Sequence, residues 1–221
     1  MTASPRAPSK TYQAFLFDMD GTLITSTAAA ERVWTRWAQR HGLDVATFVP
    51  TVHGVRAADT IRRQNLSGID LAAEVAWVER GEIEDVDGVV PIAGAIDFVR
   101  RLPPDRWAVV TSATVPLARA RLAAAGVTPP TVMITAEQVE KGKPDPAGYL
   151  LAAQTLGFAA ADCLVFEDAE AGIKAGEAAG ADVVVITAAQ THRLDTPHPE
   201  LTDYADARLE VTADGQLVFA V

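Results

Sequence analysis

Acidic and hydroxyl side chains stand at the ends of three apolar runs in this sequence. They are Asp18 and Asp20 after the run at 14–18, Thr111 and Ser112 after the run at 107–111, and Glu167 and Asp168 after the run at 163–168. If these runs are strands of one parallel sheet, their carboxyl ends meet at one edge. Four carboxylates crowded there raise one another's pKa and stay ionised only beside a cation. Oxygen ligands at this density suit Mg²⁺, so the sequence predicts a magnesium site.

A phosphate group would need positive charge and hydrogen-bond donors beside this cluster. Lys143, one of only four lysines, precedes two prolines that hold its segment extended. Thr111 and Ser112 come shortly before a helix that is predicted to begin near Pro116, so their amides and hydroxyls can face an anion. Spacing alone leaves open that Lys143 is a solvated loop lysine, and that any single acid is a helix cap.

The elements that must position these residues alternate along the chain. Apolar runs at 14–18, 107–111, 131–135, 163–168 and 182–187 predict strands buried on both faces. Helices are predicted from Pro116 to Gly126, from Asp145–Pro146 to Gly157, and from about 169 to Gly180. This alternation predicts an α/β fold with an open, doubly wound, Rossmann-like parallel sheet. At the C-terminus, Asp214-Gly215 within 208–221 predicts a hairpin with a type I′ turn.

The interval between the first two strands is long and mostly helical. It predicts a small all-helical cap at 28–90, inserted into a discontinuous core of 12–27 and 91–221, with residues 1–11 as a disordered tail. The return to the core is expected within 87–95, where proline and glycine break the helical pattern.

Several cap residues are candidates for contacts with a substrate. His53 and Arg56 flank Gly54, which lets the backbone turn towards the site; the alternative is that they cap a helix or face solvent. Trp34 and Trp37 lie three apart on one predicted helix, a spacing more typical of a core than of a pocket roof. Three histidines receive no function: His41 at a helix end, and His192 and His198 in a polar tail.

Composition restricts the class of partner. The 221 residues carry 29 acidic and 19 basic side chains, a formal charge of −10, which argues against nucleic acid and anionic membranes as partners.

No apolar run approaches the roughly 18 residues needed to cross a bilayer, and the first ten residues lead into no apolar segment of a secretory signal. Cys163 is the only cysteine and cannot form an internal disulfide, which favours a cytoplasmic location. A monomer or weak dimer is expected.

At this point the sequence resembles the haloacid dehalogenase superfamily of phosphohydrolases. The resemblance covers about residues 12–190 and all four motifs of the family in order. They read FDMDGTL (17–23), VVTSA (109–113), KGKPDPAGY (141–149) and VFEDAEAGIKAG (165–176). The insertion corresponds to the helical cap of the subfamily that holds β-phosphoglucomutase and many small phosphatases. Within it, the chain is similar to sugar and hexitol phosphatases, glycerol-3-phosphatase and 2-deoxyglucose-6-phosphatase.

The resemblance implies a role for each core residue. Asp18 would be the nucleophile that forms an aspartyl-phosphate, and Asp20 the general acid and base. Mg²⁺ would be held by Asp18, the backbone carbonyl of Asp20, Asp168 and Glu167, the last directly or through water. The phosphoryl oxygens would be bound by Thr111, Ser112 and Lys143.

The implied activity is a magnesium-dependent phosphatase acting on a small sugar or polyol phosphate. The alternative is a hexose-phosphate mutase of the β-phosphoglucomutase type. Mutases of that group share a cap stretch GVSR, where this chain reads GVRA with Arg56 one position earlier. The shifted arginine favours hydrolysis.

Overall fold

A six-stranded parallel sheet forms the centre of the protein. The computed structural model describes residues 10–190 and 193–220. The strand order is β6-β5-β2-β7-β8-β9, and every neighbouring pair is parallel. The strands are β6 (Val132–Ile134), β5 (Trp107–Val110), β2 (Ala14–Phe17), β7 (Cys163–Glu167), β8 (Asp182–Ile186) and β9 (Glu200–Leu201). All five predicted strands are therefore present, and β9 adds an edge strand.

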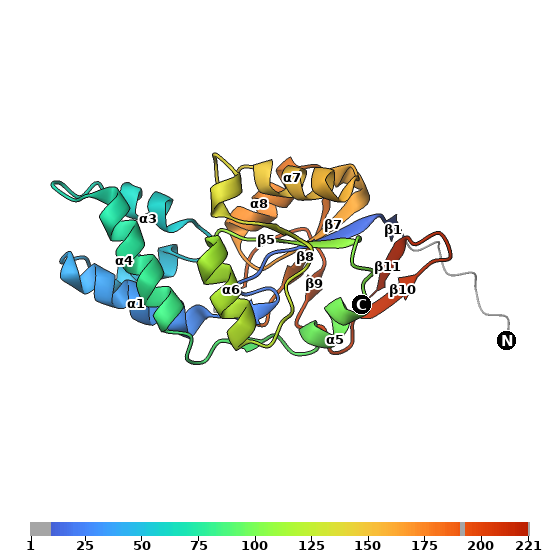
Figure 1. Ribbon diagram of the computed structural model, residues 1–221, viewed down its shortest axis with the longest axis horizontal. Helices are drawn as coiled ribbons and strands as arrows, with labels where there is room; N and C mark the ends of the chain where they lie inside the picture. Colours follow the sequence, from blue (N-terminus) through green and yellow to red (C-terminus); the bar gives the residue numbers. More distant parts are fainter. Residues whose placement is uncertain (1–9, 191–192, 221) are drawn as a thin grey trace.

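Helices cover both faces of this sheet (Figure 1). Helices α7 (Ala147–Leu156) and α8 (Glu170–Ala178) bury Tyr149 and Ile173 against one face. On the other face, α5 (Ala95–Arg100) and α6 (Val115–Ala124) contribute Phe98 and Leu117 to a second core. The predicted doubly wound α/β sheet is confirmed. Parallel strands buried on two sides need the continuous apolar runs that the sequence shows.

Four helices form a cap after the first strands. They are α1 (Thr27–Arg40), α2 (Val45–Phe48), α3 (Ala57–Arg63) and α4 (Leu71–Glu84), with a short 3₁₀ turn at Val49–Thr51. The cap has a hydrophobic core of its own, built around Trp34, Trp37 and Phe48. Trp37 Nε1 donates to Glu74 Oε2 at 2.9 Å, which satisfies the one polar atom of this buried ring.

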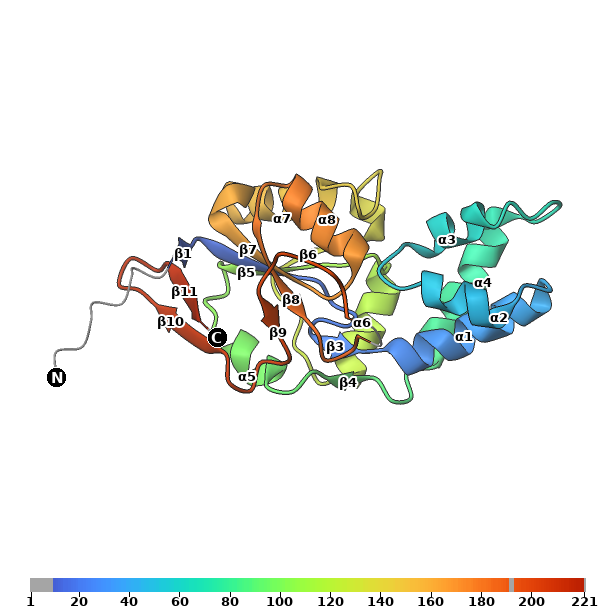
Figure 2. The same cartoon turned by 180° about the vertical axis from the view of Figure 1, so that it is seen from behind.

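Two short strands join the cap to the sheet. Strand β3 (Ile24–Thr25) pairs antiparallel with β4 (Val90–Pro91), so the chain entering the cap lies beside the chain leaving it. Figure 2 shows this pair between the sheet and the cap helices. The sequence does not predict this pair, because strands of two residues leave no periodic pattern.

The two ends of the described chain meet in a small separate sheet, which corrects two expectations. Strand β1 (Thr11–Tyr12) pairs with β11 (Leu217–Ala220), so Thr11 belongs to a strand and not to the predicted disordered tail. Strand β10 (Arg208–Val211) completes the predicted hairpin with β11. Its turn is not type I′, because only Gly215 has a positive φ (+80°) and its N–H donates to the Thr212 carbonyl at 2.9 Å. That pattern is a type I turn followed by a left-handed glycine.

Within residues 10–190 and 193–220, none of the helices combines the length and apolarity needed to cross a bilayer. His192 lies outside the described residues.

Candidate active site

Three carboxylates converge at the carboxyl edge of the sheet. Asp18 follows β2, Glu167 ends β7, and Asp168 follows it. One oxygen from each of these residues lies within 4.8 Å of the others. The Asp18 amide donates to the Phe166 carbonyl at 2.9 Å, which fixes the start of its loop against β7. The order of strands in the sheet therefore assembles the cluster.

Burial governs the electrostatics of this cluster. Glu167 is 1% exposed and Asp18 is 6% exposed. Burial raises the pKa of Asp18 well above its usual range, opposed by Lys143 and reinforced by Glu167 and Asp20. Burial also raises the pKa of Asp168, with Asp18 and Glu167 adding to the shift. The cluster therefore resists carrying its full negative charge alone.

Lys143 supplies the positive charge inside the cluster. Its Nζ donates to Glu167 Oε1 at 2.6 Å and to the Val110 carbonyl at 3.0 Å, and it pairs with Asp18 Oδ1. Burial lowers the pKa of Lys143, but Asp18 and Glu167 outweigh it and hold that pKa above the ordinary value. Lys143 is thus a fixed, charged part of the site rather than a solvated loop residue.

The donor set fits a divalent cation. Three ionised carboxylates and one ammonium leave an excess of two negative charges, and a dication would neutralise it. The ligands are hard oxygens, which suit Mg²⁺. Asp18, Glu167 and Asp168 are the side chains that could hold it. The Asp20 carboxylate is not in this group, so only its backbone carbonyl is available for the predicted ligand role.

Two glycines and a tyrosine complete the cluster, and none of the three was predicted as a site residue. A Cβ on Gly172 would lie 1.7 Å from Glu167 Oε1, and one on Gly21 (φ +87°) would lie 1.9 Å from Asp168 Oδ2. The Tyr149 hydroxyl donates to Glu167 Oε1 at 2.6 Å. Both glycines and the tyrosine stand within the motif stretches, which was the available signal.

The two hydroxyl residues lie beside the cluster, where β5 ends and α6 approaches. Thr111 is buried, and its Oγ1 accepts from the Ala113 amide at 3.1 Å. Ser112 Oγ donates to the Gly54 carbonyl of the cap at 3.0 Å. Ser112 therefore touches both the core and the cap.

A cavity of 340 Å³ lies between the cap and the core, above Asp18. The core lines it with Asp18, Asp20, Thr111 and Ser112, and the cap lines it with Trp34, His53, Gly54, Arg56, Glu79 and Glu82. The cap residues singled out in the sequence thus reach the cavity, as does Trp34, whereas Trp37 lies inside the core of the cap. A volume of this size matches a small organic ligand.

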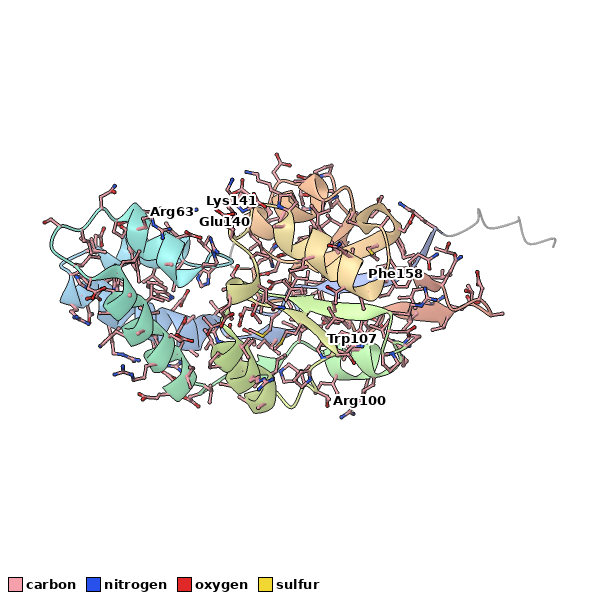
Figure 3. All side chains as sticks on the ribbon, turned by 45° about the horizontal axis from the view of Figure 1, so that its top comes forward. Arg63, Arg100, Trp107, Glu140, Lys141 and Phe158 are labelled. Carbon is pink, nitrogen blue, oxygen red and sulfur yellow. The ribbon has the colours of Figure 1, made fainter. Side chains whose placement is uncertain are left out.

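The cap residues around the cavity are held by specific contacts. His53 Nε2 lies 3.5 Å from Glu31 Oε1. Arg56 pairs with Asp59 at 2.8 Å and donates to the carbonyls of Val139 and Glu140 at 3.3 and 3.1 Å. Figure 3 shows Glu140 on the side of the core that faces the cap. Arg56 therefore joins the cap to the loop that leads to Lys143.

Asp20 faces the cavity beside the cluster and has partners that the sequence did not indicate. Its Oδ1 accepts from Ser26 Oγ at 2.6 Å and lies 3.0 Å from Arg121 Nη1. The same guanidinium reaches Glu82 of the cap at 3.1 Å. The available signal was Arg121 itself, which shares a helix face with the buried Leu117 and so needs an acidic partner.

The comparisons with known proteins agree with this geometry. The haloacid dehalogenase-like hydrolase family matches residues 12–180. Hexitol phosphatase A of Escherichia coli is 44% identical over 188 residues, which cover 83% of this chain and 87% of that protein. The 2-deoxyglucose-6-phosphate phosphatase 1 of Saccharomyces cerevisiae is 34% identical over 193 residues, or 78% of each chain.

A solved structure shares the architecture. CbbY from Rhodobacter sphaeroides in complex with phosphate has a TM-score of 0.74 at 20% identity, covering 88% of this chain and 96% of that one, which demonstrates a common fold. With the family match spanning most of the chain, this protein belongs to the haloacid dehalogenase-like hydrolases.

Proposed function

We propose that the protein is a magnesium-dependent phosphatase that hydrolyses a small sugar or polyol phosphate through an aspartyl-phosphate. The observation that carries this proposal is the pairing of Asp18, which lines the cavity between cap and core, with the buried Lys143. The names of the similar hexitol and 2-deoxyglucose-6-phosphate phosphatases support this substrate class.

Each core residue has a part in this chemistry. Asp18 attacks phosphorus, so that a bond forms from its carboxylate oxygen as the bond to the sugar or polyol oxygen breaks. Asp20 gives a proton to that leaving oxygen, then takes one from the water that hydrolyses the aspartyl-phosphate. Lys143, Thr111 and Ser112 bind the phosphoryl oxygens and stabilise their charge in the transition state.

Asp18, Asp168, Glu167 and the Asp20 carbonyl would hold Mg²⁺, which would offset the negative charge where the nucleophile and the phosphate meet. This resolves the conflict between an anionic substrate and a chain of charge −10. The local charge at the floor of the cavity, rather than the charge of the whole chain, decides whether a phosphate binds.

The mutase alternative requires a second anion site, because a bisphosphate must bind at both ends. The arginines of the cavity are already engaged by acids: Arg56 and Arg62 pair with Asp59 at 2.8 and 2.6 Å, and Arg121 pairs with Asp20 and Glu82. Glu79 and Glu137 also line the cavity. These side chains suit the hydroxyls of a neutral polyol better than a second phosphate, which supports hydrolysis.

The deciding experiment offers the purified protein and Mg²⁺ a panel of sugar, polyol and nucleotide phosphates and measures inorganic phosphate. We expect release from sugar and polyol phosphates, none from Asp18→Asn, and normal release from the exposed control Asp97→Asn. β-Glucose 1-phosphate with its bisphosphate primer belongs in the panel. Conversion to glucose 6-phosphate with little free phosphate would establish the mutase instead, and turnover by Asp18→Asn would remove the nucleophile assignment.

Two expectations outside the site stay proposals. The buried, unpaired Cys163 thiol fits a reducing compartment such as the cytoplasm. A monomer or weak dimer would be recognised by light scattering after gel filtration.

A further inference from the structure

A buried arginine links the active-site loop to the cap. Arg121 lies on α6 and is 5% exposed, deep between two acids that come from different parts of the molecule. Its Nη1 lies 3.0 Å from Asp20 Oδ1, and its Nη2 donates to Glu82 Oε1 on α4 at 3.1 Å. Removing a charged guanidinium from water costs free energy, and nearby carboxylates are needed to offset that cost. Arg121 therefore depends on both acids, one in the core and one in the cap.

The contacts around Asp20 are one-sided. Ser26 and Arg121 both contact Oδ1, whereas the described residues make no hydrogen bond to Oδ2. Ser26 stands at the N-cap position of α1, yet its hydroxyl donates to Asp20 rather than capping that helix. One oxygen of Asp20 is thus held in place, and the other is left for the cavity that Asp20 lines.

Among the described residues, the Arg121 guanidinium makes ion pairs with the two acids and hydrogen bonds to no other group. Its Nε is buried and finds no partner among the described residues, although an arginine in another orientation could use that donor. Of the two terminal nitrogens, Nη1 contacts the Asp20 carboxylate and Nη2 contacts the Glu82 carboxylate. The contact with Glu82 exists only while α4 packs against α6, which ties the arrangement at Asp20 to the seating of the cap.

We propose that Arg121 is a positioning residue that orients Asp20 for protonation of the leaving oxygen, and that its pairing with Glu82 makes this orientation depend on the docked cap. The inference rests on the proposed function. In the step concerned, the Asp18–phosphorus bond forms, the bond from phosphorus to the alkyl oxygen breaks, and the proton on Asp20 Oδ2 passes to that oxygen. Arg121 takes no part in the transfer and acts only through Asp20.

The dependence on the leaving group tests this role. A hexitol phosphate releases an alkoxide that needs the proton, whereas p-nitrophenyl phosphate releases a phenolate that leaves without one. We expect Arg121→Met to lower kcat/KM for the hexitol phosphate by about 100-fold or more and that for p-nitrophenyl phosphate by less than about tenfold. Asp20→Asn should show the same split, and Arg121→Lys, which keeps a cation near Asp20, should recover part of the loss.

Glu82→Gln provides a second variant if Arg121→Met does not fold. It keeps the size of the side chain, removes its charge, and should reproduce the split to a smaller extent. Equal losses on both substrates, or no loss on either, would refute the positioning role, because a purely structural defect does not distinguish leaving groups. If the wild-type protein releases phosphate from neither compound, the proposed function fails first and the positioning role falls with it.

Discussion

The stability of the metal-free protein should fall as the pH rises. Burial raises the pKa of both Asp18 and Asp168, so the folded state retains protons that the unfolded chain has already released. The free energy of unfolding then decreases with pH, starting near the unfolded pKa of about 3.9 and continuing until the folded pKa is passed. Each retained proton contributes a slope of about −1.4 kcal/mol per pH unit. For a chain of this size, that slope corresponds to about 3 to 6 °C of melting temperature per pH unit.

Magnesium should reverse this trend. The cation binds ionised carboxylates, so protons compete with it at low pH. A ligand present at about 100 times its dissociation constant stabilises the folded state by about 2.7 kcal/mol. We therefore expect the stabilisation by Mg²⁺ to be larger at pH of about 8 than at about 5, where protons occupy the cluster.

Urea unfolding in EDTA and in Mg²⁺, across this pH range, measures both effects. Asp168→Asn should make the slope in EDTA shallower and weaken the response to Mg²⁺, and the exposed control Asp97→Asn should change neither. This comparison also separates the cluster from Glu82, whose pKa is raised by burial as well. A flat or rising profile in EDTA, or equal stabilisation by Mg²⁺ at both ends of the range, would contradict the raised pKa of Asp18 and Asp168.

Three further outcomes can be checked. Gly172→Ala should weaken Mg²⁺ binding by about 10- to 100-fold in calorimetric titration, because the new methyl group displaces the Glu167 carboxylate; unchanged affinity would mean that Glu167 does not act on the metal. Trp37→Phe should lower the free energy of unfolding by about 1 to 3 kcal/mol in urea titration, because the indole N–H no longer donates to Glu74, and a neutral result would contradict the importance of this bond. Burial raises the pKa of Cys163 to about 12, so iodoacetamide should label the thiol only after denaturation, as judged by mass spectrometry; rapid labelling of the native protein would disagree.

The carboxylate cluster at the edge of the sheet was predictable, because strands buried on two faces appear in the sequence as continuous apolar runs. The apolar runs of β2, β5 and β7 show where each strand ends and therefore which residues follow it. Parallel pairing of the three strands brings those residues together. The contacts of Lys143 were not predictable, because they depend on the path of the loop between β6 and α7. Neighbours in space but not in sequence, such as Arg121 and Glu82, require the packing of two helices from separate parts of the chain.

Two features of local backbone geometry could not be predicted from the sequence either. The pairing of β3 with β4 involves two residues on each side, too few for a period to be seen. The turn at Gly215 depended on the sign of one φ angle at Asp214, which the pair of letters Asp-Gly does not determine.

The pairing of β3 with β4 has a consequence for how such a protein can change. The chain enters and leaves the cap through two adjacent strands, so the cap is joined to the core at a single place. Its helices also enclose a hydrophobic cluster of their own. Substitutions, insertions or the exchange of the whole cap can therefore reshape the roof of the cavity while Asp18, Lys143 and Glu167 keep their places in the core. Under the proposed function, changes in the cap would alter selectivity for the alcohol without moving the residues proposed to act on the phosphate.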